Sequence, residues 1–218
     1  MESAPNTDSW LDDTRTSYDT VAESYADYVR GLLDETPEER AVMALFADEV
    51  RSNGDGPVAD VGCGPGRITA HLAGLGLDAF GIDLSPRMIE VARREHPGLR
   101  FDVGSMTDLA LDAGSLAGLV AWYSLIHVPE DELDAVLGHF HRVLRPGAPL
   151  LLGFHVGDES TLKTEGYGGH PMKIYVHRRR QSGLAARLDD AGFTARTHRT
   201  LTSAESTLGG IVLARRRP

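Results

Sequence analysis

Short apolar runs alternate with longer stretches of mixed polarity along most of this chain. The apolar runs predict strands at about residues 57–61, 78–82, 100–103, 116–122 and 150–155. Helices are expected between them, at about 66–75, 86–95, 130–144 and 181–191, after two N-terminal helices at 10–33 and 38–50. Strands separated by helices of this length form parallel βαβ units, so the pattern predicts an α/β fold with a doubly wound sheet.

The last two β-like runs, near 194–202 and 208–215, differ from the others because only residues 203–207 lie between them. So short a connection joins antiparallel neighbours, and we expect a hairpin at the C-terminal end of the sheet. A chain of 218 residues suits one such domain with an adequate core. The sequence therefore predicts a single, mostly parallel sheet that ends in an antiparallel hairpin.

The first strand breaks into three closely spaced glycines, Gly62, Gly64 and Gly66, in the segment Val-Ala-Asp-Val-Gly-Cys-Gly-Pro-Gly. Glycines at the end of a strand let the backbone approach a ligand closely. Asp83 ends the second apolar run, at about the 20-residue distance that places a carboxylate on ribose hydroxyls. A nucleotide-like ligand is therefore expected at this turn.

The spacing separates two kinds of nucleotide site. The dinucleotide fingerprint G-x-G-x-x-G would place its third glycine at Arg67, whereas this chain has G-x-G-x-G preceded by Asp60. A neighbouring carboxylate does not stabilise a bound pyrophosphate, which is itself negatively charged. It does stabilise the cationic end of a methionine. With this motif the sequence resembles the class I S-adenosylmethionine-dependent methyltransferases. The resemblance implies a seven-stranded sheet in the order 3-2-1-4-5-7-6, with Asp60 near the amino-acid end of the cofactor and Asp83 on its ribose.

Further segments are similar to those of the same family. The resemblance implies that Leu84 and Met88 pack around adenine and that the turn with Ser105 and Met106 bonds its edge, although many relatives carry Asp at the serine position. The segment that begins at Trp122, after the fourth strand, resembles the family's segment at the edge of the sheet. The resemblance implies that it faces the reacting methyl group. The N-terminal segment Tyr-Asp-Thr-Val-Ala-Glu-Ser-Tyr implies a helical lid over the cofactor. The expected cofactor-binding residues are Tyr18, Tyr25, Asp60, Gly62, Gly64, Gly66, Asp83, Leu84, Met88, Ser105, Met106 and Trp122.

Charge is distributed unevenly. The net charge is −10, and residues 1–60 carry 15 Asp or Glu against 4 Arg. Residues 163–180 instead carry two Lys and three Arg against one Glu, in the segment where the family varies its substrate-binding insertion. Lys and Arg recognise carboxylate- or phosphate-type oxyanions, so a small anionic substrate is expected. Alternation in an extended segment would place Lys173, Tyr175 and His177 on one side, and we expect Lys173 and His177 to point inward. The expected substrate-binding residues are Tyr28, His155, Lys173, His177, Arg178 and Arg179.

The expected reaction is methyl transfer from S-adenosylmethionine, with S-adenosylhomocysteine as product, to an oxygen of a small metabolite. A phosphonate is favoured, as in natural-product and antibiotic biosynthesis, because near neutrality it offers a charged oxygen without a base. His127 and Lys173 are the candidate catalytic residues. Two alternatives remain open: a carboxyl or hydroxyl acceptor, with His127 or His155 as the base, and a methyltransferase-like protein that binds cofactor without catalysis.

The remaining expectations concern the environment of the protein. Cys63 is the only cysteine, and the polar, acidic N-terminal residues contain no signal-peptide apolar region, so a cytoplasmic location is expected. No metal, membrane or nucleic-acid partner is expected, and the chain is expected to be a monomer or homodimer. We expect one domain over 1–218, in which 1–50 form the helical lid region, 51–155 the cofactor-binding core, 156–180 the substrate-binding insertion, and 181–218 the C-terminal helix and hairpin.

Overall fold

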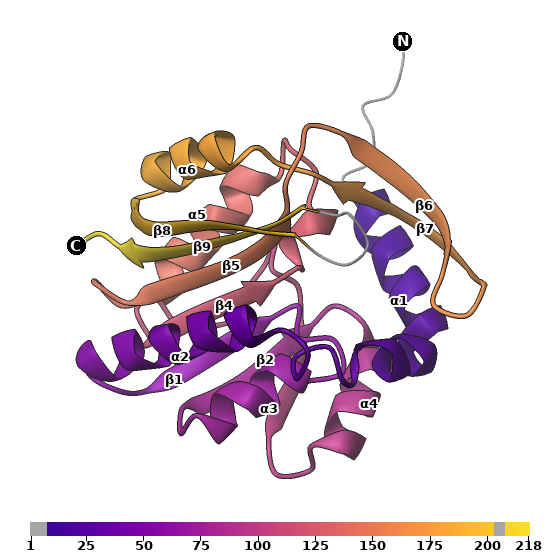
Figure 1. Cartoon of the computed structure of the whole chain (residues 1–218), viewed down its shortest axis with the longest axis horizontal. Coiled ribbons are helices and arrows are strands. Elements are labelled where there is room, and N and C mark those ends of the chain that lie inside the picture. The colour runs from indigo at the N-terminus through magenta and orange to yellow at the C-terminus, as the bar shows by residue number, and fades with distance from the viewer. Residues whose placement is uncertain (1–7, 203–207) are drawn as a thin grey trace.

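A computed structural model describes residues 8–202 and 208–218. Its main sheet has seven strands in the order β3-β2-β1-β4-β5-β9-β8, which crosses the centre of Figure 1. The strands are β1 Pro57–Val61, β2 Asp78–Asp83, β3 Arg100–Val103, β4 Gly118–Trp122, β5 Pro149–His155, β8 Phe193–Thr202 and β9 Leu208–Arg216. The first five are parallel, and β9 is antiparallel to both β5 and β8. The predicted fold is therefore confirmed, whereas the expected turn at 203–207 lies outside the described residues.

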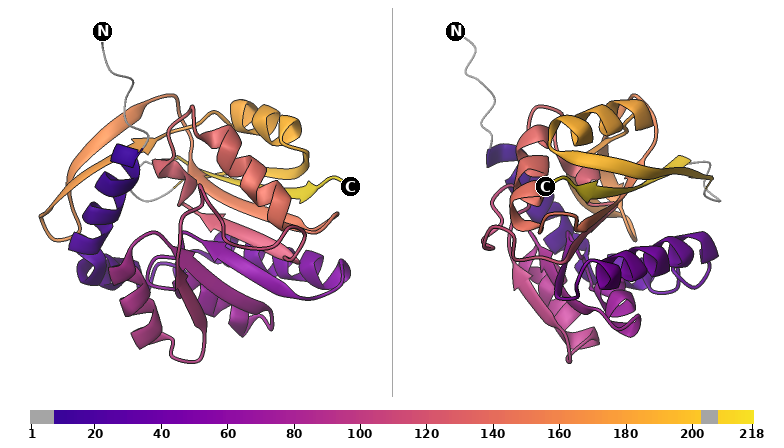
Figure 2. Two further views of the ribbon diagram at one scale, coloured as in Figure 1. Left: turned by 180° about the vertical axis from the view of Figure 1, so that it is seen from behind. Right: turned by 90° about the vertical axis from the view of Figure 1, so that its left-hand side faces the viewer.

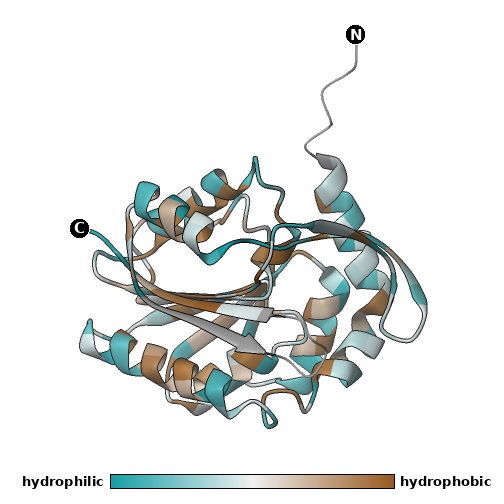
Figure 3. Ribbon diagram, turned by 45° about the horizontal axis from the view of Figure 1, so that its top comes forward, coloured by the Kyte–Doolittle hydropathy of each residue, from teal (hydrophilic) through white to brown (hydrophobic). Residues whose placement is uncertain are grey.

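Helices cover both faces of this sheet (Figure 2). One face packs against α2 Pro37–Ser52 and α3 Arg67–Gly74, and the other against α5 Leu133–Val143 and α6 Gln181–Asp190. Hydrophobic residues line the helix faces turned to the sheet, and hydrophilic ones the outward faces (Figure 3). None of the helices in 8–202 and 208–218 combines the length and apolar character needed to cross a bilayer.

One expected helix is shorter than the sequence suggests. The helix predicted at 130–144 begins only at Leu133, and a 3₁₀ turn, η1 Leu125–His127, precedes it. Pro129 ends the 3₁₀ turn, because a proline disfavours the helical conformation of the residue before it. Val128 is accordingly extended, with φ −75° and ψ 124°. This break places His127 at the carboxyl end of β4.

The segment after β5 forms a separate two-stranded antiparallel sheet, β6 Ser160–Gly166 and β7 His170–His177. This hairpin lies beside α1 Asp8–Val29, at the right of Figure 1. Met172 and Ile174 are buried against Val21 of α1, so the alternate residues of β7 face outward. Lys173 belongs to the outward set: 69 % of its side chain is exposed, and its Nζ pairs with Asp13 at 2.8 Å. The expected inward orientation of Lys173 is therefore wrong, because the apolar alternates of β7 take the buried face.

Helix α1 is held on two sides, above the carboxyl ends of the strands. On one side its Ser17 Oγ accepts a hydrogen bond from the backbone N–H of Lys173 at 2.8 Å. On the other side Asp19 accepts one from Ser85 Oγ at 2.6 Å. Ser85 is also the N-cap of α4 Pro86–Glu95, where its Oγ accepts from the N–H of Met88. The helix thus lies between α4 and the hairpin.

Candidate active site

The turn after β1 needs its glycines for two different reasons. Gly62, Gly64 and Gly66 have φ values of 76°, 54° and 84°, in the left-handed region that favours glycine. A Cβ on Gly62 would lie 2.2 Å from the Cβ of Ser124, and one on Gly66 would lie 2.7 Å from the ring of Phe101. Gly62 and Gly64 line the pocket described below, whereas Gly66 begins α3 and packs behind it. The first two glycines therefore shape the pocket, and the third lets the helix approach the sheet.

Asp83 links the ends of β1 and β2. Its two carboxylate oxygens accept hydrogen bonds from the N–H groups of Gly64 and Ser85, each at 2.8 Å. Burial raises the pKa of Asp83 to about 6, although both hydrogen bonds act in the opposite direction. The side chain lines the pocket. A carboxylate fixed in this way has lone pairs left for hydroxyl donors of a ligand.

Asp60 is buried behind the same turn and is only half satisfied. Its Oδ2 accepts a hydrogen bond from Thr69 Oγ1 at 2.7 Å, but its Oδ1 has no partner among the described residues. Burial raises the pKa of Asp60 to about 7. An unpaired buried carboxylate oxygen is costly, so it marks a place where a ligand donor would be favourable.

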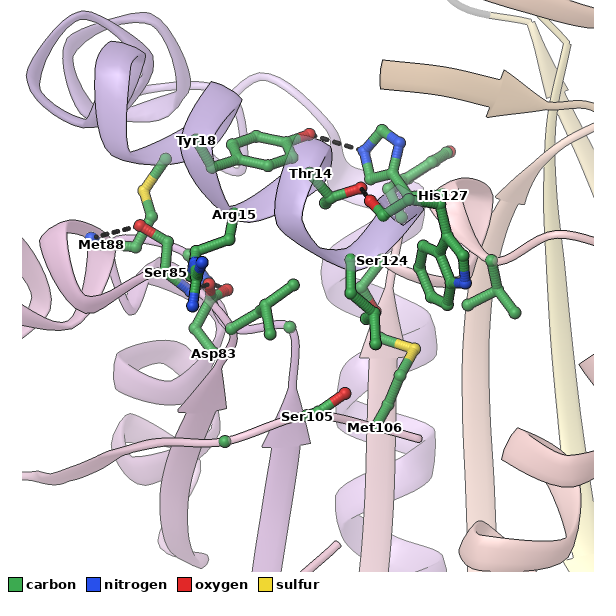
Figure 4. Close-up of a pocket in the computed structure, with 18 of the residues that line it drawn as sticks. Thr14, Arg15, Tyr18, Asp83, Ser85, Met88, Ser105, Met106, Ser124 and His127 are labelled. Carbon is green, nitrogen blue, oxygen red and sulfur yellow. Dashed lines mark hydrogen bonds between the residues drawn. The ribbon is translucent and has the colours of Figure 1, made fainter. Parts of the chain in front are cut away.

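The pocket itself lies between α1 and the strand ends (Figure 4). Its floor comes from the turns after β1, β2 and β3, one wall from η1 and the end of β4, and its cover from α1. The lining residues are Trp10, Leu11, Thr14, Arg15, Tyr18, Tyr25, Gly62, Gly64, Asp83, Leu84, Ser85, Met88, Gly104, Ser105, Met106, Trp122, Tyr123, Ser124, His127 and Val128. No three His, Cys, Asp or Glu side chains in the described part of the chain are grouped so as to hold a metal ion.

A hydrogen-bonded chain joins the cover to the wall. The Tyr18 hydroxyl lies 2.7 Å from His127 Nε2, and His127 Nδ1 lies 2.8 Å from the backbone oxygen of Tyr175. Since a carbonyl oxygen only accepts, the proton of neutral His127 sits on Nδ1, and Nε2 accepts from Tyr18. Burial lowers the pKa of His127 to about 4 and raises that of Tyr18 well above its usual value. Both groups are therefore neutral near pH 7, and the imidazole is a weak base.

Most residues expected at a cofactor do come together here. The pocket collects ten of the twelve: Tyr18, Tyr25, Gly62, Gly64, Asp83, Leu84, Met88, Ser105, Met106 and Trp122. Asp60 and Gly66 lie directly behind the glycine turn instead. Ser105 is engaged within its own turn, because its Oγ lies 2.7 Å from Thr107 Oγ1 and accepts from the Thr107 N–H.

The residues expected at a substrate are more scattered. The structure buries Arg179 and directs its guanidinium to the carbonyl oxygens of Leu125 and Val128, so this charge holds η1 in place rather than facing the pocket. His177 bonds Ser160 Oγ through Nδ1 at 2.7 Å, on the outward side of the hairpin. Arg178 lies in a surface cleft beside α6. These three residues do not line the pocket.

Two other expected substrate residues lie near the pocket but outside its lining. Tyr28 is 49 % exposed, with its ring 5.4 Å from that of Tyr167. His155 is at the end of β5, with its ring 5.2 Å from the ring of Tyr123, and its Nδ1 is buried without a partner among the described residues.

Sequence reasoning missed the first two turns of α1, which contribute Trp10, Leu11, Thr14 and Arg15 to the pocket. The signal was present, because these positions continue the face of Tyr18 at intervals of three and four residues. Figure 4 shows Thr14, Arg15 and Tyr18 on this helix face. The sequence analysis also did not single out Tyr123, which lines the pocket. Tyr123 adopts a φ of 53°, which is unusual for a residue with a side chain.

Residues 58–147 match the family model of a methyltransferase domain. That stretch contains the glycine turn, Asp83, η1 and His127. In this stretch the chain is similar to the class I S-adenosylmethionine-dependent methyltransferases. The match supports the family expected from the sequence.

Curated relatives and solved structures agree with this assignment. The chain is 30 % identical over 160 residues to the O-methyltransferase cnsE of Penicillium expansum, covering 65 % of this chain and 57 % of that protein. It is 32 % identical over 151 residues to the ubiquinone biosynthesis O-methyltransferase of Xanthomonas axonopodis pv. citri, covering 62 % and 61 %. The chain thus spans about three-fifths of these relatives. The structure of DhpI in complex with SAH superposes with a TM-score of 0.76 at 20 % identity, covering 98 % of this chain and 100 % of that one, which shows the shared fold.

Proposed function

We propose that this pocket binds S-adenosylmethionine and that the protein transfers the methyl group to an oxygen of a small acidic acceptor. The unpaired Oδ1 of Asp60 suits the ammonium group of the cofactor, and the carboxylate of Asp83 suits its ribose hydroxyls. Gly62 and Gly64 leave the room that close approach requires. When bound, the cofactor would supply an electrophilic methyl group on a sulfonium, which is already a good leaving group.

The main support for an acidic acceptor is that His127 is neutral and only weakly basic. An imidazole with a pKa of about 4 removes a proton poorly from an aliphatic alcohol, because a general base works best with a pKa near the working pH. An acceptor that is already ionised needs no base. The Tyr18 hydroxyl, now donating to His127, can donate to such an oxyanion instead. Tyr18 and His127 would then orient the nucleophile and keep water away from it.

A phosphonate of natural-product biosynthesis is our first candidate acceptor. It supplies a charged oxygen near neutral pH. Chain length, the insertion after β5 and the N-terminal helix also resemble those of the phosphonate O-methyltransferase of dehydrophos biosynthesis. In this proposal residues 1–50 act as the lid, 51–155 as the cofactor-binding core and 156–180 as the acceptor-binding insertion of one domain. A soluble cytoplasmic monomer or homodimer remains our prediction.

Turnover with a panel of acceptors tests this function. The wild-type protein, supplied with S-adenosylmethionine, is offered matched phosphonates, carboxylates and phenols of the same carbon skeleton, and S-adenosylhomocysteine formation is measured. We expect release with the phosphonates and carboxylates above that with the phenols. Faster methylation of the phenols would favour a hydroxyl acceptor with His127 as its base. Binding of the cofactor without transfer to any member of the panel would favour the non-catalytic alternative.

A further inference from the structure

The two faces of the β6–β7 hairpin differ in what they present. In an antiparallel pair, residues directly opposite each other carry their side chains on the same face. Leu162 is opposite Tyr175, and both are exposed on the outer face. Lys163 is opposite Ile174, which is buried against α1. Lys163 therefore lies on the inner face of the hairpin, whereas Lys173 lies on the outer face.

Contacts of the Lys163 side chain agree with this register. A Cβ built on Gly166 would lie 2.7 Å from Lys163 Cε and 2.8 Å from Met172 Sδ, so the lysine stem runs beside a methionine that is itself buried. Its Nζ lies 3.9 Å from the centroid of the Tyr167 ring. The Tyr167 ring in turn contacts Tyr25 at 4.7 Å, and Tyr25 lines the pocket. The ammonium is thus directed toward the pocket side of the hairpin.

The Lys163 ammonium influences two histidines, His127 and His155. Burial is the main cause of the lowered pKa of His127 and of His155, and the positive charge of Lys163 contributes to both. His127 belongs to the pocket wall, and the ring of His155 contacts that of Tyr123, which also lines the pocket. Two neutral imidazoles therefore share the neighbourhood of one cation.

We propose that Lys163 binds an oxyanion of the acceptor and is the residue by which this enzyme selects acidic acceptors. The inference rests on the proposed function and specifies how the acceptor is recognised there. A lysine ammonium carries three donors, so a contact with one partner leaves others for a ligand, and a charge-assisted hydrogen bond is stronger than a neutral one. The partner would be a phosphonate or carboxylate oxygen. Lys173 takes no part in this recognition.

The matched pair Lys163→Met and Lys173→Met tests the proposal, because the two lysines occupy opposite faces of one hairpin. Calorimetry on protein saturated with S-adenosylhomocysteine measures the binding of phenylphosphonate and benzoate. We expect Lys163→Met to weaken both by roughly 10- to 150-fold, the usual effect of losing a hydrogen bond to a charged group. Lys173→Met should stay within about twofold of the wild type, and Lys163→Arg should recover most of the affinity. Each variant's affinity for S-adenosylhomocysteine should be unchanged.

Several results would overturn the inference. These are equal affinity in Lys163→Met and the wild type, an equal loss in Lys173→Met, no recovery in Lys163→Arg, or no binding of either anion by the wild type. Failure of the proposed function can be distinguished from failure of this inference. If the wild type methylates a member of the acceptor panel, methyl transfer stands whatever Lys163→Met does to anion binding. If the wild type transfers no methyl group to any acceptor yet binds both anions through Lys163, anion recognition stands and the proposed reaction falls.

Discussion

The floor and the roof of the pocket are built in different ways. The floor is made by the turns after β1, β2 and β3. At residues 60–66 and 83–88 its geometry is set by short-range features, such as left-handed glycines and the hydrogen bonds that Gly64 and Ser85 donate to Asp83. The roof comprises α1 and the β6–β7 hairpin, which are joined by contacts between distant parts of the chain, such as Ser17 with Lys173.

This difference separates the two tasks of the site. The floor offers fixed acceptors, which suit a ligand that is the same in every turnover. The roof and the adjoining η1 wall offer a tyrosine, a weakly basic histidine and a lysine, whose positions depend on how α1 and the hairpin pack. Elements held by fewer local contacts open more readily, which suits entry and release of an acceptor. We therefore expect floor variants to change cofactor affinity and roof variants to change turnover.

Asp83→Ala should give the largest effect, on the floor. The change removes two acceptors for ribose hydroxyls and also the bonds to Gly64 and Ser85, and should weaken S-adenosylhomocysteine binding by about 2–4 kcal/mol, roughly 30- to 1,000-fold. Calorimetry measures the dissociation constant, and Asp78→Ala, at the exposed opposite end of the same strand, is the matched control. Unchanged affinity in the Asp83 variant would contradict the assignment of this floor to the cofactor.

Tyr18→Phe tests the roof with the next largest effect. The variant removes the donor to His127 Nε2 and leaves that buried nitrogen unpaired, which costs about 1–3 kcal/mol. If the hydroxyl also orients the acceptor, kcat/KM should fall by roughly 5- to 150-fold while S-adenosylhomocysteine affinity changes little. Steady-state kinetics and calorimetry on the same sample make the comparison. A loss confined to cofactor affinity would place Tyr18 with the floor.

The pH dependence of stability sharpens the contrast further, because the buried carboxyls of the floor have raised pKa values. Burial raises the pKa of Asp60 to about 7 and of Asp83 to about 6, above an unfolded value of about 3.9. Between these values the folded chain retains protons that the unfolded chain has released. The contribution of these two carboxyls to the free energy of unfolding should therefore fall as pH rises from 4 to 7, by at most about 1.4 kcal/mol per pH unit for each group. Buried His127, whose pKa is lowered to about 4, contributes in the opposite direction.

Asp60→Asn separates the contribution of one group. The amide does not titrate, so urea unfolding should show that this variant loses less stability than the wild type as pH rises from 4 to 7. Saturating S-adenosylhomocysteine should weaken the pH dependence of the wild type, because its ammonium favours the ionised form of Asp60. Parallel pH profiles for the two ligand-free proteins would show that Asp60 is not the group that titrates.

The smallest expected effect is on the dynamics of the roof. Adding S-adenosylhomocysteine should slow hydrogen exchange across residues 10–33 and leave α6, which contributes no residue to the pocket, unchanged. Mass spectrometry of peptides from both regions measures the difference. Equal exchange of residues 10–33 with and without ligand would mean that α1 is a static part of the core and not a lid.

The sequence could predict the floor but not the orientation of the roof. Glycine spacing and the distance to Asp83 are local signals, and the sheet order followed from a family resemblance. Alternation in β7 correctly grouped Lys173 with His177, but it could not by itself say which face is buried. The apolar partners Met172 and Ile174 held that information. Arg179 is a different case, since the carbonyl oxygens that it binds lie more than 50 residues away in sequence.

Methyl transfer to an acidic oxygen in this pocket can be tested directly. The most direct test follows the methyl carbon itself: wild-type protein is incubated with S-adenosylmethionine labelled with ¹³C in the methyl group and with a phosphonate panel, and the products are followed by ¹³C NMR. We expect a new O-methyl resonance coupled to ³¹P, absent without protein and strongly reduced in Tyr18→Phe. Label that stays on sulfur, or that appears on nitrogen or carbon, would contradict it.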